Sequence, residues 1–249
     1  LDIAGFLMQY DDMMEFTFGK WDENQPDTIL GGANSFNFYG LGFKSVNVGK
    51  TQISGIELSI SGQGKITNNI TMSILAGYTY MQPISLIKNV VYDIYQGSYA
   101  LEAFVDGEYQ DAENISDVTY NNSSSDPSVL KYRYKHIAKI DAELTYKKLS
   151  LGGSLRYNDF MRNIDAVFTD KLINEGLGDG LPAVIPGIND AREKFKDGDI
   201  IIDTRFGYQM NDMIRFGFVV NNLLNREYMS RPANMMPPRT FAMKLALKI

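Results

Sequence analysis

The sequence contains no cysteine, and it has only one histidine among its 249 residues. Without cysteine, a disulfide-stabilised module, a cysteine-based zinc site and thiol catalysis are all excluded. Acidic residues outnumber basic residues by 30 to 24, and the resulting net charge of −6 argues against a protein that binds nucleic acid. No segment approaches the roughly 18 consecutive apolar residues of a membrane-spanning helix, which excludes a helical membrane protein.

The chain starts at Leu1, with neither a methionine nor the basic and apolar segment of a secretion signal. We therefore expect either a mature, processed product or a fragment of a longer protein. Aromatic residues make up 12% of the chain, a content that argues against disorder.

The dominant pattern is an alternation of apolar and polar residues with a period of two, which indicates strands with one apolar and one polar face. At the C-terminus, for example, Phe241, Met243, Leu245 and Leu247 share one face. The pattern predicts eight strands, over residues 1–16, 52–61, 70–80, 136–147, 149–158, 200–209, 213–221 and 240–249. All eight prolines lie at the ends of these segments or between them, as strand pairing requires.

Short and long connections alternate between the predicted strands. The short ones are 62–69, 147–148 and 210–212, and the long ones are 17–45, 81–135, 159–199 and 226–238. Alternate connections of an antiparallel meander lie at the same end of the sheet. We therefore expect tight turns at one end and long loops at the other.

The polar face carries charges in mid-strand, and aromatic residues gather at the strand ends. The charged residues are Glu57, Lys139, Asp141, Glu143, Arg156, Asp203, Arg205, Arg215 and Lys244. The aromatic residues are Tyr10, Phe16, Tyr78, Tyr80, Tyr157, Phe160, Tyr228 and Phe241 at the long-loop end, and Tyr146 and Tyr208 at the other. Aromatic girdles around strands of about 9–11 residues are typical of outer-membrane barrels. The sequence thus predicts an all-β fold, a transmembrane antiparallel up-and-down β-barrel, with a soluble all-β protein as the alternative.

Three segments resemble TonB-dependent outer-membrane receptors. The C-terminal features are Asn222-Leu223-Leu224-Asn225, then Tyr228, then Pro238-Arg239-Thr240-Phe241 at the start of the last strand. Gly55 and Glu57 resemble the G-x-E strand of the family, and residues 76–80 resemble the strand that follows it. The last residue, Ile249, departs from the aromatic residue with which family members usually end.

The resemblance implies a barrel of about 22 strands that is closed by an N-terminal plug domain. Residues 1–249 would then be the C-terminal part of one barrel domain. Their eight or so strands would form the last third of the barrel. The implied function is the energised uptake of a scarce nutrient, such as an iron chelate, cobalamin or an oligosaccharide. The implied partners are outer-membrane lipid, the remaining barrel strands and the TonB complex, which acts through the plug; a surface lipoprotein is left open. Neither catalytic residues nor a cofactor is expected.

The long loops carry many aromatic residues, and loops on a rigid scaffold often form binding sites. Among them, the candidate ligand-binding residues are Trp21, Tyr92, Tyr95, Tyr109 and Tyr132. Stacking on flat or ring-shaped ligands and packing of the loops against themselves are equally compatible with the sequence.

Other features favour structural roles. His136 has no serine motif beside it, so a structural histidine at a strand end is favoured over a catalytic base. Residues 106–126 hold six carboxylates without EF-hand spacing, which favours a solvated loop over a calcium site. Met235 and Met236 favour loop packing over capture of a soft metal. The mid-strand charges favour polar networks between strands over a substrate path.

Two further hypotheses remain at this point. A self-contained eight-stranded barrel that acts as an anchor or adhesin would need residues 1–16 to form a regular closing strand. An outer-membrane enzyme would depend on His136.

Overall fold

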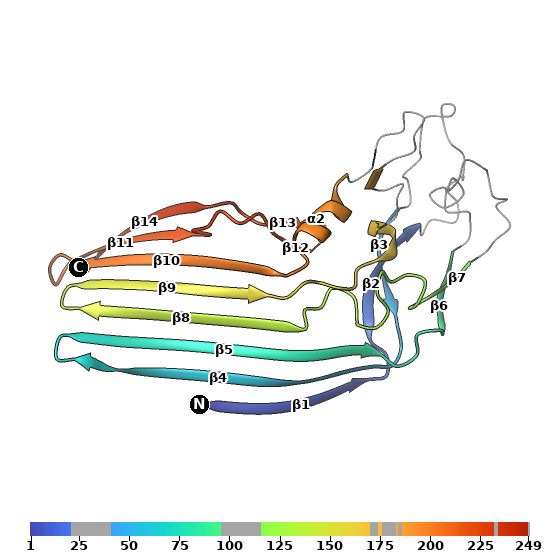
Figure 1. Cartoon of the computed structure of the whole chain (residues 1–249), viewed down its shortest axis with the longest axis horizontal. Coiled ribbons are helices and arrows are strands. Elements are labelled where there is room, and N and C mark those ends of the chain that lie inside the picture. Colours follow the sequence, from blue (N-terminus) through green and yellow to red (C-terminus); the bar gives the residue numbers. More distant parts are fainter. Residues whose placement is uncertain are drawn as a thin grey trace.

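The computed structural model describes residues 1–20, 41–95, 116–169, 174–175, 183, 186–231 and 234–248. Its largest element is an antiparallel sheet of eight strands in the order β1-β4-β5-β8-β9-β10-β11-β14 (Figure 1). These strands are β1 (Asp2–Tyr10), β4 (Thr51–Thr67), β5 (Ile70–Ser85), β8 (His136–Tyr146), β9 (Leu149–Asn158), β10 (Asp199–Gln209), β11 (Ile214–Asn221) and β14 (Thr240–Leu247). The predicted all-β fold and the eight predicted strands are confirmed.

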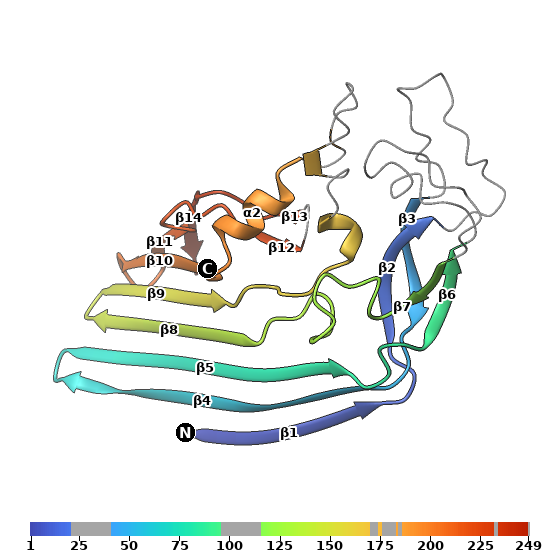
Figure 2. The ribbon, with the colours of Figure 1, turned by 45° about the vertical axis from the view of Figure 1, so that its right-hand side comes forward.

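The sheet is open along both edges in the part of the chain that the structure describes. Strand β1 pairs with β4 and strand β14 pairs with β11, but β1 and β14 do not pair with each other. Figure 2 shows the eight strands as one curved wall with β1 and β14 at its margins. A self-contained eight-stranded barrel would require the missing pairing.

The strand register places the apolar residues on one continuous face. Ile140 of β8, for example, lies opposite Ala76 of β5 on one side and Leu155 of β9 on the other. Side chains on this face are uncovered, with Met243 76% and Leu151 58% exposed. In a soluble sandwich or barrel this face would be packed inside, so its exposure supports contact with lipid instead.

The opposite face carries the charged residues, which form networks between strands. Arg205 of β10 donates hydrogen bonds to both Asp141 and Glu143 of β8, each with a donor–acceptor distance of 2.8 Å. Arg156 of β9 pairs with Asp203 of β10 over 3.0 Å. These contacts confirm, for these five residues, the interpretation that mid-strand charges link the strands of the wall.

Three predicted boundaries are wrong. Strand β4 extends to Thr67, so only two residues, 68–69, remain of the predicted turn 62–69. Strand β5 extends beyond its predicted end at residue 80 to Ser85. The predicted first strand divides after Tyr10, and its second part belongs to β2 (Met14–Lys20), which pairs with β3 (Leu41–Asn47) instead of joining the large sheet. The acidic pair Asp11-Asp12 interrupts the alternation where the chain leaves the sheet.

The remaining elements gather at the end of the sheet that carries the long connections (Figures 1 and 2). They are the β2–β3 hairpin, β6 (Val91–Tyr95) paired with β7 (Ser116–Thr119), the 3-10 helix η2 (Ala166–Thr169), α2 (Ile188–Lys194), and β12 (Met229–Arg231) paired with β13 (Asn234–Met235). The predicted separation of tight turns from long loops is confirmed. No helix in the described ranges is long and apolar enough to cross a membrane.

Two buried apolar clusters lie at this loop end. One contains Val46, Val48, Tyr120 and Leu130, and the other contains Met161, Ile164, Phe168 and Ile188. The loops therefore have packed interiors of their own, which can hold side chains in fixed positions.

Candidate ligand-binding site at the loop end

A cavity of about 470 Å³, the loop-end cavity, lies among the elements at the end of the sheet that carries the long connections. Its lining residues come from β2, β3, β13, η2 and the segment before β8; they are Met14, Glu15, Phe16, Phe43, Lys131, Tyr132, Arg133, Phe168 and Asn234. Apolar and aromatic side chains with a few polar groups are the usual lining of a small-molecule site.

A buried ion pair holds the segment that forms one side of this cavity. Lys131 Nζ lies 2.6 Å from Asp165 Oδ1, and the two side chains are 0% and 2% exposed. The ammonium also donates to Ser123 Oγ over 3.0 Å and to Thr17 Oγ1 over 3.4 Å. Because these partners satisfy the lysine, the pair fixes the position of its segment rather than offering a free charge.

Tyr132 is fixed at both its side chain and its backbone. Its hydroxyl donates to the second carboxylate oxygen of Asp165, and burial, together with this carboxylate, raises the pKa of the phenol. Its backbone has φ of 57°, in the left-handed region that aromatic residues rarely adopt. The backbone N–H donates to the Asn163 carbonyl over 2.9 Å. Such strained residues often occur at functional sites, where the surroundings hold them in place.

A hydrogen-bond network around Tyr120 orders the residues before Lys131. The Tyr120 hydroxyl accepts the backbone N–H of Lys131 over 2.6 Å. The Asn163 side-chain amide donates to the Val129 carbonyl over 2.6 Å. Both Tyr120 and Asn163 are buried, so these bonds form away from solvent.

Glu15 is the carboxylate of the loop-end cavity, and only 7% of this residue is exposed. Its Oε2 accepts a long hydrogen bond of 3.4 Å from the Tyr120 hydroxyl, whereas its Oε1 is buried without a hydrogen-bond partner among the described residues. Burial raises the pKa of Glu15 to about 7, although the charges of Arg133 and Lys131 act in the opposite direction.

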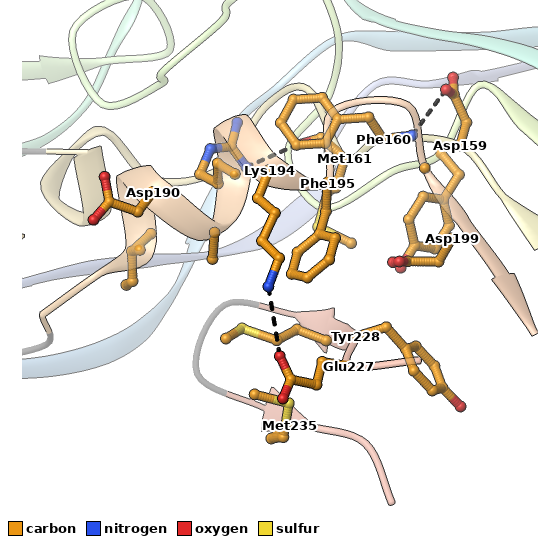
Figure 3. Close-up of a pocket in the computed structure, with 16 residues that line it drawn as sticks. Asp159, Phe160, Met161, Asp190, Lys194, Phe195, Asp199, Glu227, Tyr228 and Met235 are labelled. Carbon is orange, nitrogen blue, oxygen red and sulfur yellow. Dashed lines mark hydrogen bonds and ion pairs between the residues drawn. The ribbon is translucent and has the colours of Figure 1, made fainter. Parts of the chain in front are cut away.

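A second cavity of about 340 Å³, the helix cavity, lies between α2, the ends of β9 and β10, and the β12–β13 hairpin (Figure 3). Several of its charged groups already have partners within the protein. The Arg226 guanidinium lies 4.3 Å from the centre of the Phe195 ring and 3.0 Å from Asp199 Oδ1. Lys194 points toward Glu227 across the cavity, at 3.7 Å.

Tyr228 lines the helix cavity and is buried. The prediction that it belongs to the aromatic girdle is therefore wrong. The reason is that Arg226, anchored to Asp199, turns this segment of the chain inward beside α2.

The five candidate residues have different outcomes. Tyr132 lines the loop-end cavity. Tyr92 and Tyr95 lie in β6, but the positions of their side chains are not described. Trp21 and Tyr109 lie outside the described residues. The sequence reasoning missed Glu15 and Arg133, which no local pattern distinguishes from other strand and loop charges.

His136 and Met235 lie in structural settings, whereas residues 106–115 of the acidic segment 106–126 lie outside the described residues. His136 begins β8, where its Nδ1 lies 2.7 Å from the Tyr78 hydroxyl and its ring packs against Tyr80. Met235 lines the helix cavity together with Met161 and Met229. Within the described ranges, no group of three or more His, Asp or Glu residues is placed to hold a metal ion.

Comparison with known proteins identifies one family. The sequence matches "TonB dependent receptor-like, beta-barrel" over residues 1–223. No curated protein is similar enough in sequence to match the chain.

Several solved structures resemble the chain. The ferric-catecholate import receptor Fiu of Escherichia coli K12, in its closed form, is 19% identical with a TM-score of 0.50, and the match covers 98% of this chain and 24% of that one. The copper transporter OprC is 14% identical with a TM-score of 0.50, over 98% of this chain and 28% of that one. The pyoverdine receptor FpvA of Pseudomonas aeruginosa is 13% identical with a TM-score of 0.47, over 99% and 27%. This chain spans about a quarter of the length of these proteins. At such low identity, the likeness to Fiu and OprC shows a shared fold alone.

Proposed function

Because the chain belongs to the family of TonB-dependent receptor β-barrels, we propose that it forms part of an outer-membrane receptor for the energised uptake of a scarce nutrient. The family is one of outer-membrane transport receptors, in agreement with the predicted location and with the expectation that the chain is not an enzyme. In this proposal the large sheet is a section of the barrel wall, and the loop end captures the ligand.

We further propose that residues 1–249 belong to a single barrel domain. The open edges at β1 and β14 support this proposal, because the hydrocarbon region requires every backbone polar group to be paired. The remaining barrel strands would continue from these two edges. The plug and its contact with the TonB complex would lie in other parts of the receptor, as would any contact with a surface lipoprotein.

The observation that carries the proposed capture site is the loop-end cavity. It combines a strained, anchored Tyr132 with the exposed rings of Phe16 and Phe43. An iron chelate, cobalamin and an oligosaccharide each offer flat or apolar surfaces to such rings. The ferric-catecholate and copper receptors share the fold, but at 19% and 14% identity they do not choose among these ligands.

The test is an uptake assay with the complete receptor in cells that depend on one limiting nutrient, either an iron chelate, cobalamin or an oligosaccharide. We expect Phe16→Ala and Phe43→Ala to reduce the uptake of one of these nutrients, and we expect loss of the TonB complex to abolish it. Phe241→Ala is the matched control, because this ring is also exposed but lies at the start of β14 on the apolar face.

Band shifts between heated and unheated samples would show whether each variant still inserts as a folded barrel. Uptake that is independent of the TonB complex, or equal in all three variants, would contradict the proposal. An anchor or adhesin, in contrast, would keep its function without the TonB complex.

A further inference from the structure

The tight turns of the large sheet carry more basic than acidic side chains. These turns are residues 68–69, 147–148 and 210–213, and Figure 1 shows them together on the left, opposite the long connections. They form one end of the sheet, the turn end. Lys147 and Lys148 make up the β8–β9 turn, and Asp212 is the one acidic residue in the three turns. Because short turns face the periplasm in bacterial outer-membrane barrels, the turn end belongs at the inner leaflet of the membrane.

Lys147 reaches back over the apolar face of the sheet. Its ammonium nitrogen lies 5.3 Å from the centre of the Tyr146 ring. The strand register places Tyr146 opposite Ile70 of β5 and Leu149 of β9, at the last pairing before the turn. Tyrosine rings at the border of an apolar face lie at the level of the lipid headgroups. The lysine therefore carries its charge at the same level, with its stem along apolar surface.

Lys148 is held at the same border by the neighbouring turn. Its ammonium donates a hydrogen bond to the Met210 carbonyl oxygen, with a donor–acceptor distance of 3.1 Å. Tyr208, two residues before Met210, lies opposite Leu149 on the apolar face. An ammonium group has three donors, so this bond leaves donors for a ligand. Both Lys147 and Lys148 are exposed, and the ion pairs among the described residues involve neither of them.

The backbone of the turn supports a role for Lys147 beyond closing the hairpin. Its φ is 51°, in the left-handed region that glycine or asparagine usually occupies in two-residue turns. A lysine in this conformation is strained where a glycine would not be. Strained residues occur often at functional sites. In this turn, the strained residue is the one whose ammonium lies over the Tyr146 ring.

We infer that the β8–β9 turn binds the phosphate of an anionic glycerophospholipid in the inner leaflet, with Lys147 and Lys148 as its cationic partners and Tyr146 beside its glycerol. A phosphate diester accepts charge-assisted hydrogen bonds from ammonium groups, and the apolar face continues from this point along the acyl chains. Two neighbouring lysines favour a lipid with a net negative charge over a zwitterionic one, whose own cation they would repel.

The inference goes beyond the proposed function, because it concerns the barrel wall and rests on the outer-membrane location of the family. Lys65 provides the contrast within the turn end. It is also exposed, but it lies opposite Thr71 on the charged face and is therefore outside the site.

A fluorescent label beside the turn gives a local measurement. The label would be attached to Leu149→Cys, an exposed position of the apolar face, in the complete receptor in phosphatidylcholine vesicles. Residues 1–249 contain no cysteine of their own, and any accessible cysteine elsewhere in the receptor would be replaced by serine. The vesicles would also contain phosphatidylglycerol or phosphatidylcholine with the same nitroxide-labelled acyl chain. We expect phosphatidylglycerol to quench the label more strongly at equal mole fraction, and the difference to shrink at high salt.

Three variants test the named residues. Lys147→Gly and Lys148→Gln should each reduce the preference for phosphatidylglycerol about fivefold, the effect expected for one basic residue at a membrane surface. Lys147→Gly is suited to this test because glycine accepts the left-handed backbone, so the variant should fold at least as stably as the wild type. Lys65→Gln is the matched control and should leave the preference unchanged.

Equal quenching by the two lipids, an unchanged preference in Lys147→Gly and Lys148→Gln, or an equal loss in Lys65→Gln would overturn the inference. A preference that is lost in sodium phosphate but kept in sodium chloride of the same ionic strength would assign the site to free phosphate and would also overturn it. The uptake assay is separate. Energised uptake without a lipid preference would remove only this inference, whereas a lipid preference without energised uptake would remove only the proposed function.

Discussion

Arg205 and Asp141 form a paired hydrogen bond although their strands, β10 and β8, are separated by β9. The two terminal nitrogens of the guanidinium each reach a carboxylate oxygen over 2.8 Å. The contact passes over Gly152 of β9, where a Cβ atom would lie 2.6 Å from the guanidinium carbon. The absence of a side chain at this position therefore allows one arginine of β10 to reach β8 across the strand between them.

Gly152→Ala should displace the Arg205 side chain and weaken the wall. We expect a loss of about 1–2 kcal/mol of unfolding free energy, the lower part of the range for hydrogen bonds to charged groups, because the partners are about one-third exposed. Urea unfolding of the complete receptor in lipid vesicles would measure it. Gly153→Ala is the control, since its Cβ would meet only the Asp203 carbonyl at an ordinary 3.4 Å. Equal stability of the two variants would contradict the steric account.

The two faces of the sheet should respond differently to the same new charge. Ile140 and Leu75 are both exposed, but Ile140 lies on the apolar face and Leu75 lies on the charged face, opposite Asp141. Ile140→Arg should cost about 2–4 kcal/mol in a bilayer, whereas Leu75→Arg should cost little because Asp141 is its cross-strand neighbour. Folding titrations in vesicles would compare them. A larger cost at Leu75 would reverse the assignment of the lipid face.

Removing one member of the buried ion pair should destabilise the loop end. Lys131→Met leaves Asp165 buried without its cation, and we expect a loss of about 3–5 kcal/mol in the local stability of the loops. Limited proteolysis of the folded receptor would detect the opening, because the sheet itself should remain intact. Lys196→Met removes an exposed lysine that pairs with Glu193, and it should change protease resistance hardly at all.

Stability of the loop end should decrease as the pH rises. The pKa of Glu15 increases from 4.5 to about 7 on folding, so the folded state binds more protons than the unfolded state between these values. The contribution of about 3 kcal/mol is fully present below pH 4.5 and is lost as the pH rises through 7. Hydrogen exchange in β2 and β3 at pH 5 and pH 8 would measure it. The difference between wild type and Glu15→Gln isolates this residue, and an equal pH response of both proteins would contradict the prediction.

The sheet could be predicted because one face meets lipid and therefore accepts apolar residues at every second position. The alternation of apolar and polar residues is less clear where glycine or proline occurs within a strand. Gly62 and Gly64 hid the end of β4, and Pro83 obscured the continuation of β5. The β2–β3 hairpin was missed because its two strands are separated by 20 residues, so no short turn indicated that they pair.

The candidate site was largely beyond the reach of the sequence. Lys131 and Asp165 lie 34 positions apart, and neither is preceded by a motif that requires a partner. The burial of Glu15 results from tertiary packing. In the sequence, Glu15 stands between the apolar residues Met14 and Phe16, a pattern that normally indicates a charged residue facing solvent on a strand. Tyr132 was among the candidates because aromatic residues in long loops often take part in binding, and it lines the loop-end cavity, whereas its left-handed backbone could not be predicted.

The segregation of tight turns from long loops sets different tolerances for change at the two ends of the sheet. The entropy of closing a flexible loop grows only with the logarithm of its length, so each doubling costs about 0.6 kcal/mol. A two-residue turn, in contrast, fixes the register of its strands, and a one-residue slip would exchange the lipid-facing and charged faces. Insertions and deletions should therefore accumulate at the loop end at little thermodynamic cost, so that the loops can diversify while the wall stays the same.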